Sequence, residues 1–226
     1  MQIKNRKEYL KAFTLAEVLI TLGIIGIVAA MTLPTLIQKN EERVTVTKVK
    51  KFYSVMNQAL LMAIKDNGYV DEWNFIETDK DNNRLGDKLA QKIKPYLKIA
   101  KDCGTNSNCI TNDTYKLLNG SNWQPYTDVR YYKMILADGT YMWLRTNTSG
   151  SECTDIDGGV QNTCGVIWID INGKLPPNTI GKDTFNFVIT KNRIIPSNLD
   201  DCNVNNAGWS CSAYILSNSN MKYLHK

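Results

Sequence analysis

The side chains that most often carry enzyme chemistry are scarce in this 226-residue sequence. Its one histidine, His225, is the penultimate residue. A Ser-His-Asp or Cys-His arrangement needs its imidazole in an ordered pocket, which a chain terminus seldom provides. The sequence also lacks an HExxH motif, a phosphate-binding P-loop and a dinucleotide fingerprint. It therefore predicts a protein that is not an enzyme and has no cofactor, with calcium as the one ion to consider.

Oxygen-bearing side chains recur instead in one segment of the second half of the chain. Asp170, Asn172 and Asp183 offer the hard oxygen ligands that calcium prefers at an extracellular site. The glycine falls at the fourth position of this segment, so it is not an EF-hand loop. The same residues fit an Asx-type turn between two strands, and both interpretations stay open. The shorter segment DIDG, residues 155–158, allows the same two interpretations.

A single carboxylate, Glu17, directly precedes the uncharged run from Val18 to Ile37. This run has 20 residues, and a helix of that length spans about 30 Å, the thickness of a bilayer core. A charge within hydrocarbon costs free energy. In a plain signal peptide cleaved near residues 29–31, Glu17 would be discarded and would have no function.

Basic residues flank the apolar run on both sides. Residues 1–12 carry four Lys or Arg against one Glu, and residues 38–66 carry six against three Asp or Glu. Residues 67–226 are neutral, with 17 basic and 17 acidic side chains. Charge gathered beside an apolar run suits a membrane surface. A neutral bulk argues against nucleic acid as the partner, because phosphate binding needs a concentrated basic face.

The segment KAFTLAEVLITLGIIGIVAAMTLP, residues 11–34, resembles the amino terminus of type IV prepilins and type II secretion pseudopilins. The resemblance implies that a prepilin peptidase cleaves between Ala12 and Phe13 and N-methylates Phe13, with residues 1–12 as the leader. Glu17 matches the acidic residue of that family, and Pro34 matches its helix-kinking proline. Ala12 departs from the glycine that the family usually has before the cut.

The same resemblance implies a structural filament subunit assembled with other pilin or pseudopilin subunits through its N-terminal helix. Glu17 would pair with the ammonium group of Phe13, in its own chain or in a neighbour. The protein would cross the bacterial inner membrane once, with an extracytoplasmic head, and then enter a filament in the periplasm or at the cell surface. Some pseudopilin heads bind calcium in oxygen-rich loops. A membrane-anchored extracytoplasmic binding domain that does not polymerise is the alternative, and the kind of filament is left open.

Apolar periodicity predicts the elements that position these residues. A transmembrane and assembly helix over 13–37 continues as an amphipathic helix over 38–66, ending at Asn67-Gly68. The apolar stripe of the continuation is Val49, Phe52, Met56, Ala59, Leu60, Ala63 and Ile64. In the head, 67–226, we expect one helix over 84–101 or two short ones, with a break near Pro95. We also expect a hairpin over 131–145 and strands over 165–171 and 185–190. The fold class is α+β: a long N-terminal helix packed on a small antiparallel sheet, similar to a pilin.

Six cysteines follow the apolar segment, and no CxxC motif occurs. Disulfides in an oxidising compartment explain them better than zinc or redox sites, with free buried thiols as the alternative. Of the 15 connectivities that six cysteines allow, we favour the sequential one because short-range pairs close local loops. These pairs are Cys103–Cys109, Cys153–Cys164 and Cys202–Cys211. Residues 191–226 are rich in Asn and Ser. Without a crosslink such a tail would be flexible, so it gains most from the last pair.

Overall fold

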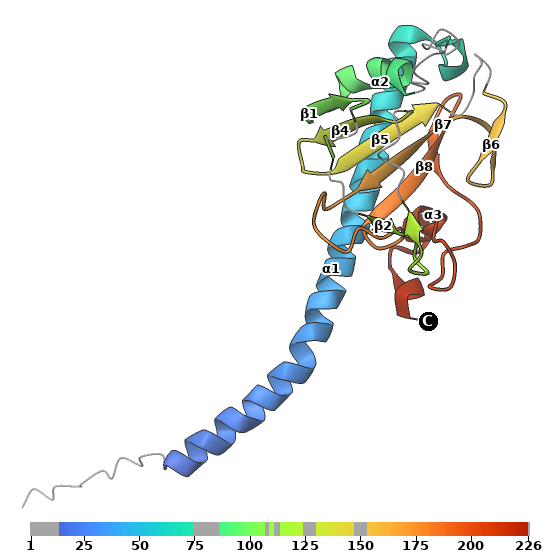
Figure 1. Cartoon of the computed structure of the whole chain (residues 1–226). Helices are drawn as coiled ribbons and strands as arrows, with labels where there is room; N and C mark the ends of the chain where they lie inside the picture. Colours follow the sequence, from blue (N-terminus) through green and yellow to red (C-terminus); the bar gives the residue numbers. More distant parts are fainter. Residues whose placement is uncertain are drawn as a thin grey trace, which may run out of the picture. The chain divides into compact units, whose positions relative to one another are not determined.

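The long N-terminal helix, α1, runs over Leu15–Asn67 (Figure 1). The structure, a computed structural model, describes residues 14–74, 86–106, 109–110, 114–123, 130–146 and 153–225. The chain divides into two compact units, one ending at Glu41 and one over Glu42–Lys226. We call them the stem and the head. The division places the second part of α1 with the head.

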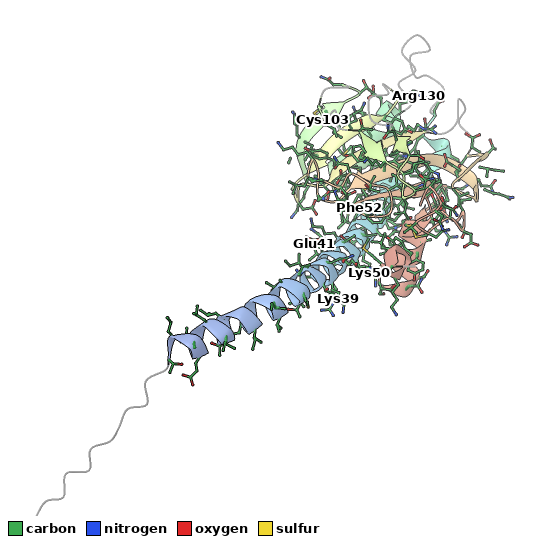
Figure 2. All side chains as sticks on the ribbon, turned by 60° about the horizontal axis from the view of Figure 1, so that its bottom comes forward. Lys39, Glu41, Lys50, Phe52, Cys103 and Arg130 are labelled. Atoms are coloured by element: carbon green, nitrogen blue, oxygen red, sulfur yellow. A yellow bond between two sulfur atoms is a disulfide. The ribbon has the colours of Figure 1, made fainter. Side chains whose placement is uncertain are left out.

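The described part of the stem is helical, and nearly all of its side chains are exposed. Figure 2 shows these side chains projecting from a bare helix. By length and composition the helix is able to cross a membrane, which fits both an anchor and a signal sequence. The helix continues through Pro34, so the local melting that a proline favours is not seen there.

The head part of α1 buries one face. Its buried residues are Val46, Val49, Phe52, Met56, Ala59, Leu60 and Ala63. Six of these were predicted from the apolar stripe, and the seventh predicted member, Ile64, is half-buried. The helix ends where predicted, because Gly68 takes φ +80° and donates its N–H to the Ile64 carbonyl.

A seven-stranded antiparallel sheet packs against this helix face. Its order is β1 (Ile99–Gly104), β4 (Tyr132–Leu136), β5 (Tyr141–Thr146), β7 (Val160–Asp170), β8 (Thr184–Thr190) and β9 (Ile194–Pro196), and β6 (Asp155–Asp157) also pairs with β7. A separate small hairpin joins β2 (Tyr115–Lys116) and β3 (Asn122–Trp123). The predicted hairpin is confirmed as β4–β5, with Met134 opposite Met142.

The two faces of the sheet build two apolar clusters. Ile167 and Phe187 belong to the cluster that includes the buried face of α1. Trp168, the residue after Ile167 in β7, and Trp143, its partner in β5, belong to a second cluster with Tyr115 of β2. Strand alternation explains the separation, because successive side chains point to opposite faces. The head therefore has an α+β arrangement in which the helix is part of the core.

The prediction for residues 84–101 is right about the break near Pro95 and wrong about the end of the segment. Two short helical pieces meet beside Pro95, namely α2 (Asp87–Ile93) and a 3-10 turn, η3 (Lys94–Tyr96). Residues 99–104 then form β1, because pairing with β4 overrides the local helical pattern. The tail over 191–226, which the last disulfide crosslinks, contains α3 (Cys211–Asn218) and a 3-10 turn, η4 (Lys222–His225), which the sequence analysis did not predict. This region is ordered because it buries apolar side chains, among them Ile215 and Tyr223.

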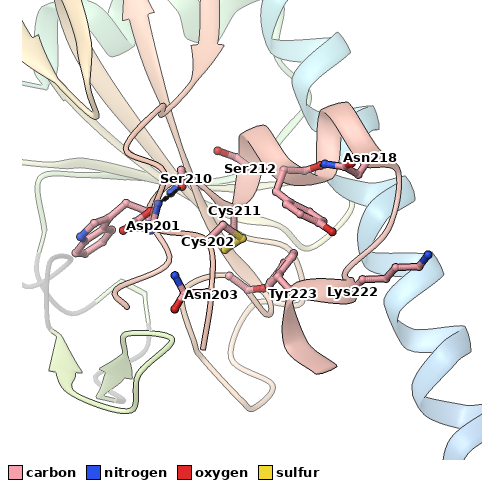
Figure 3. Close-up of a disulfide and its surroundings, with 12 residues drawn as sticks. Asp201, Cys202, Asn203, Ser210, Cys211, Ser212, Asn218, Lys222 and Tyr223 are labelled. Atoms are coloured by element: carbon pink, nitrogen blue, oxygen red, sulfur yellow. Dashed lines mark hydrogen bonds between the residues drawn. A yellow bond between two sulfur atoms is a disulfide. The ribbon is translucent and has the colours of Figure 1, made fainter. Parts of the chain in front are cut away.

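The six cysteines form the three sequential pairs, Cys103–Cys109, Cys153–Cys164 and Cys202–Cys211. The last pair ties the segment after β9 to the start of α3 (Figure 3). Beside it, Asp201 Oδ1 accepts hydrogen bonds from the N–H and the hydroxyl of Ser210, each at 2.7 Å. Disulfide and carboxylate together position α3 against the core.

Candidate functional site

Glu17 and Thr14 form a reciprocal pair of interactions at the start of α1. Both the N–H and the hydroxyl of Thr14 donate to Glu17 Oε2, each at 2.8 Å. The N–H of Glu17 donates back to Thr14 Oγ1 at 3.2 Å. Thr14 precedes the first helical residue and Glu17 is the third, which is the arrangement of a capping box. The carboxylate therefore satisfies backbone and side-chain donors that the helix start would otherwise leave exposed.

The sequence carried a signal for this arrangement that our prediction did not use. The letters TLAE, residues 14–17, have the spacing of a capping box, in which Ser or Thr precedes Glu or Gln by three positions.

Ala12 and Phe13, the expected cleavage pair, and the leader over 1–12 lie outside the described residues. Pairing of Glu17 with the Phe13 ammonium therefore stays a prediction.

His225 joins the C-terminal turn to the head part of α1. Its Nε2 lies 2.7 Å from Glu42 Oε1, and its side chain is about half exposed. In the turn that carries it, Tyr223 is buried and donates its hydroxyl to the Gly181 carbonyl. The contact ties the end of the described chain to the helix near the boundary with the stem.

Asp170 is the last residue of β7, and Asp183 lies directly before β8, at the other end of the connection between these strands. Tyr115 donates its hydroxyl to Asp170 Oδ2 at 2.6 Å, and the N–H of Asn172 donates to Oδ1 at 3.1 Å. Asp183 accepts from the N–H groups of Asn178 and Thr179, both at 2.7 Å. These bonds order the loop in the manner of the Asx-type turn considered from the sequence.

The two carboxyl groups are buried and electrostatically coupled. Burial, and secondarily the nearby charge of Asp183, raise the pKa of Asp170 to about 8. Burial also raises the pKa of Asp183. Two ionised carboxylates that interact in a medium of low dielectric constant are unfavourable. A proton on one of them, or a bound cation, would remove that unfavourable charge.

Unpaired oxygens in the same loop favour the cation as a proposal. Among the residues that the structure describes, the buried side-chain oxygens of Asn172 and Asn178 have no hydrogen-bond donor. Like the carboxyl oxygens of Asp170 and Asp183, these are oxygens of the hard kind that calcium prefers, and all four residues belong to one stretch of the chain. Within the described ranges no group of three or more His, Cys, Asp or Glu could hold a metal. Any calcium site here therefore depends on the amide oxygens.

We expect an Asp170→Asn variant to have a flatter dependence of stability on pH. A raised pKa means that the folded chain keeps a proton that the unfolded chain releases between about pH 4 and pH 8. The wild-type free energy of unfolding should therefore fall as the pH rises from 5 to 8, by roughly 4 kcal/mol. The part of this fall that Asp170 causes should disappear in the variant, and only the part that Asp183 causes should remain. Urea unfolding at pH 5 and pH 8 measures it.

Wild type and Asp170→Asn also show whether a proton or a calcium ion neutralises the two carboxyl groups. If calcium neutralises the pair, millimolar calcium raises the melting temperature of the wild type at pH 8, EDTA reverses the rise, and Asp170→Asn does not respond. The control is Asp200→Asn, which removes an exposed carboxylate and should change neither behaviour. Equal pH slopes in wild type and Asp170→Asn would contradict the protonation, and no calcium response in the wild type would end the calcium proposal.

The described residues line at least two grooves on the head. The larger, about 630 Å³, lies between the 3-10 turn η1 (Val70–Glu72), the β6–β7 hairpin and the β8–β9 turn, and its charged residues are Asp71, Glu72, Lys191 and Arg193. The smaller, about 360 Å³, lies between α1, the start of β1 and the β4–β5 turn. The sequence did not indicate either groove, because each is formed by segments far apart along the chain.

Comparison with known proteins gives a family but no function. Residues 35–214 match the model of a family of unknown function, DUF6613. No curated protein and no solved structure matches the chain. The matched range covers well over half of the chain and includes every strand of the sheet. The chain therefore belongs to the DUF6613 family.

Proposed function

We propose that the protein is a structural subunit of a type IV pilus-like or type II secretion pseudopilus filament. A prepilin peptidase would cut it before Phe13, and its N-terminal helix would then assemble with other subunits. One observation carries the proposal: an exposed apolar helix with a single carboxylate at its start belongs to the same α1 whose later turns form the core of a folded head.

The exposed stem needs an apolar environment. Among its side chains, Leu15, Ile25 and Met31 are 78, 63 and 73 % exposed. Removing apolar surface from water stabilises by about 25 cal/mol per Å². A lipid bilayer would cover this surface before assembly, and the stems of neighbouring subunits would cover it afterwards. The protein would thus be an inner-membrane protein with one membrane span that moves into a filament.

In the proposed process Glu17 would have one set of partners before cleavage and a larger set after it. Before the cut, its carboxylate is held by Thr14. After the cut, the ammonium group of Phe13 would lie one residue before Thr14. A carboxylate accepts several hydrogen bonds at once, so Glu17 would keep the cap and also bind this ammonium, its own or that of a neighbour. Pairing lowers the cost of both charges in hydrocarbon.

Three disulfides support an extracytoplasmic head. Every cysteine of the chain is paired, within described residues, and disulfides persist in oxidising compartments such as the periplasm and the cell surface. The head would therefore fold outside the cytoplasm. This supports an orientation in which the leader stays on the cytoplasmic side.

Intact-mass spectrometry of the protein purified from its host tests the proposal. We expect a species that begins at Phe13, carries one added methyl group and retains three disulfides. A matched culture without prepilin peptidase activity should yield the full-length chain. A species that retains Met1 in normal cells, or one cut after Ala30, would overturn the filament proposal.

The larger groove favours a second candidate, an anchored extracytoplasmic binding domain that does not polymerise. Its volume of about 630 Å³ falls within the range of ligand sites. However, Lys191 and Asp71 of its lining pair with each other at 2.9 Å, so part of its charge is already compensated. Retention of Met1 in the mass measurement would favour this candidate.

A further inference from the structure

Three of the six basic residues over 38–66 donate hydrogen bonds to other segments of the head. They are Lys48, Lys50 and Lys51, all in the first turns of the head part of α1. Their acceptors are, in the same order, the Ile171 carbonyl at 2.9 Å, Ser219 Oγ at 2.5 Å and Asp138 Oδ2 at 2.9 Å. The basic charge that suited a membrane surface in the sequence is therefore partly used within the head.

A fourth polar contact lies on the same part of the helix. It is the pair of Glu42 with His225, at 2.7 Å. The partners of the four contacts come from four segments, because Ile171 directly follows β7 and Asp138 lies in the β4–β5 turn, whereas Ser219 directly follows α3 and His225 ends η4. We call these four contacts the collar, and the residues of α1 that they hold, 42–51, the collar section.

Apolar burial of α1 is concentrated after the collar section. Within 42–51 the buried apolar side chains are those of Val46 and Val49. Over 52–63 they are Phe52, Met56, Ala59, Leu60 and Ala63. This later section also accepts a hydrogen bond from the edge of the sheet, in which the N–H of Ile194 donates to Asn57 Oδ1 at 2.9 Å. Because apolar burial is the dominant favourable term in folding, the later section is held more firmly than the collar section.

Water can replace most of the collar contacts. The side chains of Lys51 and Asp138 are 59 and 44 % exposed, and that of His225 is 47 % exposed. Exposed ion pairs contribute little to stability, and only the bond of Lys48 to Ile171 is partly buried. A segment with few buried apolar contacts and solvent-exposed bonds opens at a lower free energy than the core. The collar section therefore has the properties of a local opening unit.

We propose that the collar section is releasable: it separates from the rest of the head when the collar opens, while Phe52 and the residues after it stay packed. The released section remains helical, because its backbone hydrogen bonds lie within α1. Separation exposes two valine side chains and leaves the larger apolar contact of the helix intact. At 1.5 Å per residue, release frees about 15 Å of helix from the head.

In the proposed filament, a releasable section makes the connection between head and stem adjustable. The surroundings of the stem change when a subunit leaves the bilayer and joins other stems. A head whose first helical turns can detach is able to shift relative to its stem without unpacking its core. This use of the section rests on the proposed filament function, whereas the release itself follows from the contacts of the head alone.

The reactivity of a single buried thiol measures the release. All native cysteines are paired, so Val49→Cys and Ala59→Cys each add the one free thiol to the full-length chain. Val49 and Ala59 are 0 and 1 % exposed, so alkylation at either position requires an opening. Each rate is measured in detergent and divided by the rate of the same chain in denaturant, after peptide mapping of the three native disulfides. We expect Val49→Cys to react at least about tenfold faster than Ala59→Cys.

Replacing the three collar lysines with glutamine tests the collar. It should speed alkylation of Val49→Cys by about tenfold or more and change that of Ala59→Cys by less than about twofold. The control is Lys65→Gln, an exposed position of α1 outside the collar, which should change neither rate.

Equal rates at the two positions would overturn the inference, and so would a failure of the collar substitutions to speed alkylation of Val49→Cys. The measurement uses membrane-extracted protein and does not require filaments. If processed filaments form but the two thiols react alike, only this inference fails. If Met1 is retained and the two thiols differ as expected, the proposed function fails and the release stands.

Discussion

Replacing Glu17 with alanine is expected to abolish filament formation and to leave the head folded. The carboxylate lies in the stem, and its contacts in the described chain are with Thr14, so no contact of the head is lost. In the proposed assembly the Phe13 ammonium would lose its partner and remain unpaired in hydrocarbon. Leaving one member of a buried ion pair alone destabilises by about 3–5 kcal/mol. Filament yield should therefore fall more than a hundredfold.

Two further variants separate the charge of Glu17 from its capping role. Glu17→Gln keeps a capping box, because glutamine also serves at the third helical position, but it removes the charge. Thr14→Ala keeps the charge and removes the cap, which typically costs about 1 kcal/mol. We expect Glu17→Gln to fail like Glu17→Ala and Thr14→Ala to assemble at reduced yield. Sheared filaments are quantified by immunoblot, with membrane-fraction protein as the expression control.

The reverse order would contradict the pairing hypothesis. If Glu17→Gln assembles like wild type and Thr14→Ala does not, the glutamate serves only as a cap. Intact mass of each membrane-extracted variant separates a defect in cleavage from a defect in assembly. A variant that still begins at Phe13 but forms no filament has lost assembly alone. A variant that retains Met1 would show that Glu17 or Thr14 acts at the cleavage step.

The sequence predicted best where one local pattern decides the outcome. The stripe through Val49 and Met56 repeats at helical spacing, so the buried face of α1 followed from periodicity. The turn at Asp138-Gly139 fixed the β4–β5 hairpin for a similar reason. Each cysteine also found its partner within 11 positions along the chain.

The sequence predicted less well where contacts between distant segments determine the local structure. Residues 99–101 carry a helical pattern, yet they pair with β4, more than 30 positions away. The tail is polar in composition, but Ile215 and Tyr223 supply enough apolar burial to order it. The loop from Asp170 to Asp183 is an intermediate case. That the two carboxyl groups lie near each other followed from the connection between adjacent strands. The burial that raises both pKa values depends on packing between segments far apart in the sequence, such as the contact of Asp170 with Tyr115.

Packing of α1 on the sheet gives the largest expected effect on stability. Phe52 is 6 % exposed, and its ring centroid lies 5.5 Å from that of Phe187 in β8. Figure 2 places Phe52 among the crowded side chains of the head. Truncation of a buried phenylalanine to alanine removes apolar contacts and leaves a cavity. We therefore expect Phe52→Ala to lower the free energy of unfolding by about 3–5 kcal/mol.

Chemical unfolding of the full-length chain in detergent, followed by tryptophan fluorescence, measures this change. Leu61→Ala is the matched control, because Leu61 lies on the same helix but is 57 % exposed, and it should change stability by less than about 0.5 kcal/mol. A double-mutant cycle with Phe187→Ala should give a coupling of about 0.5–1.5 kcal/mol, since the two rings are in contact. Equal small effects of Phe52→Ala and Leu61→Ala would show that α1 is not part of the head core.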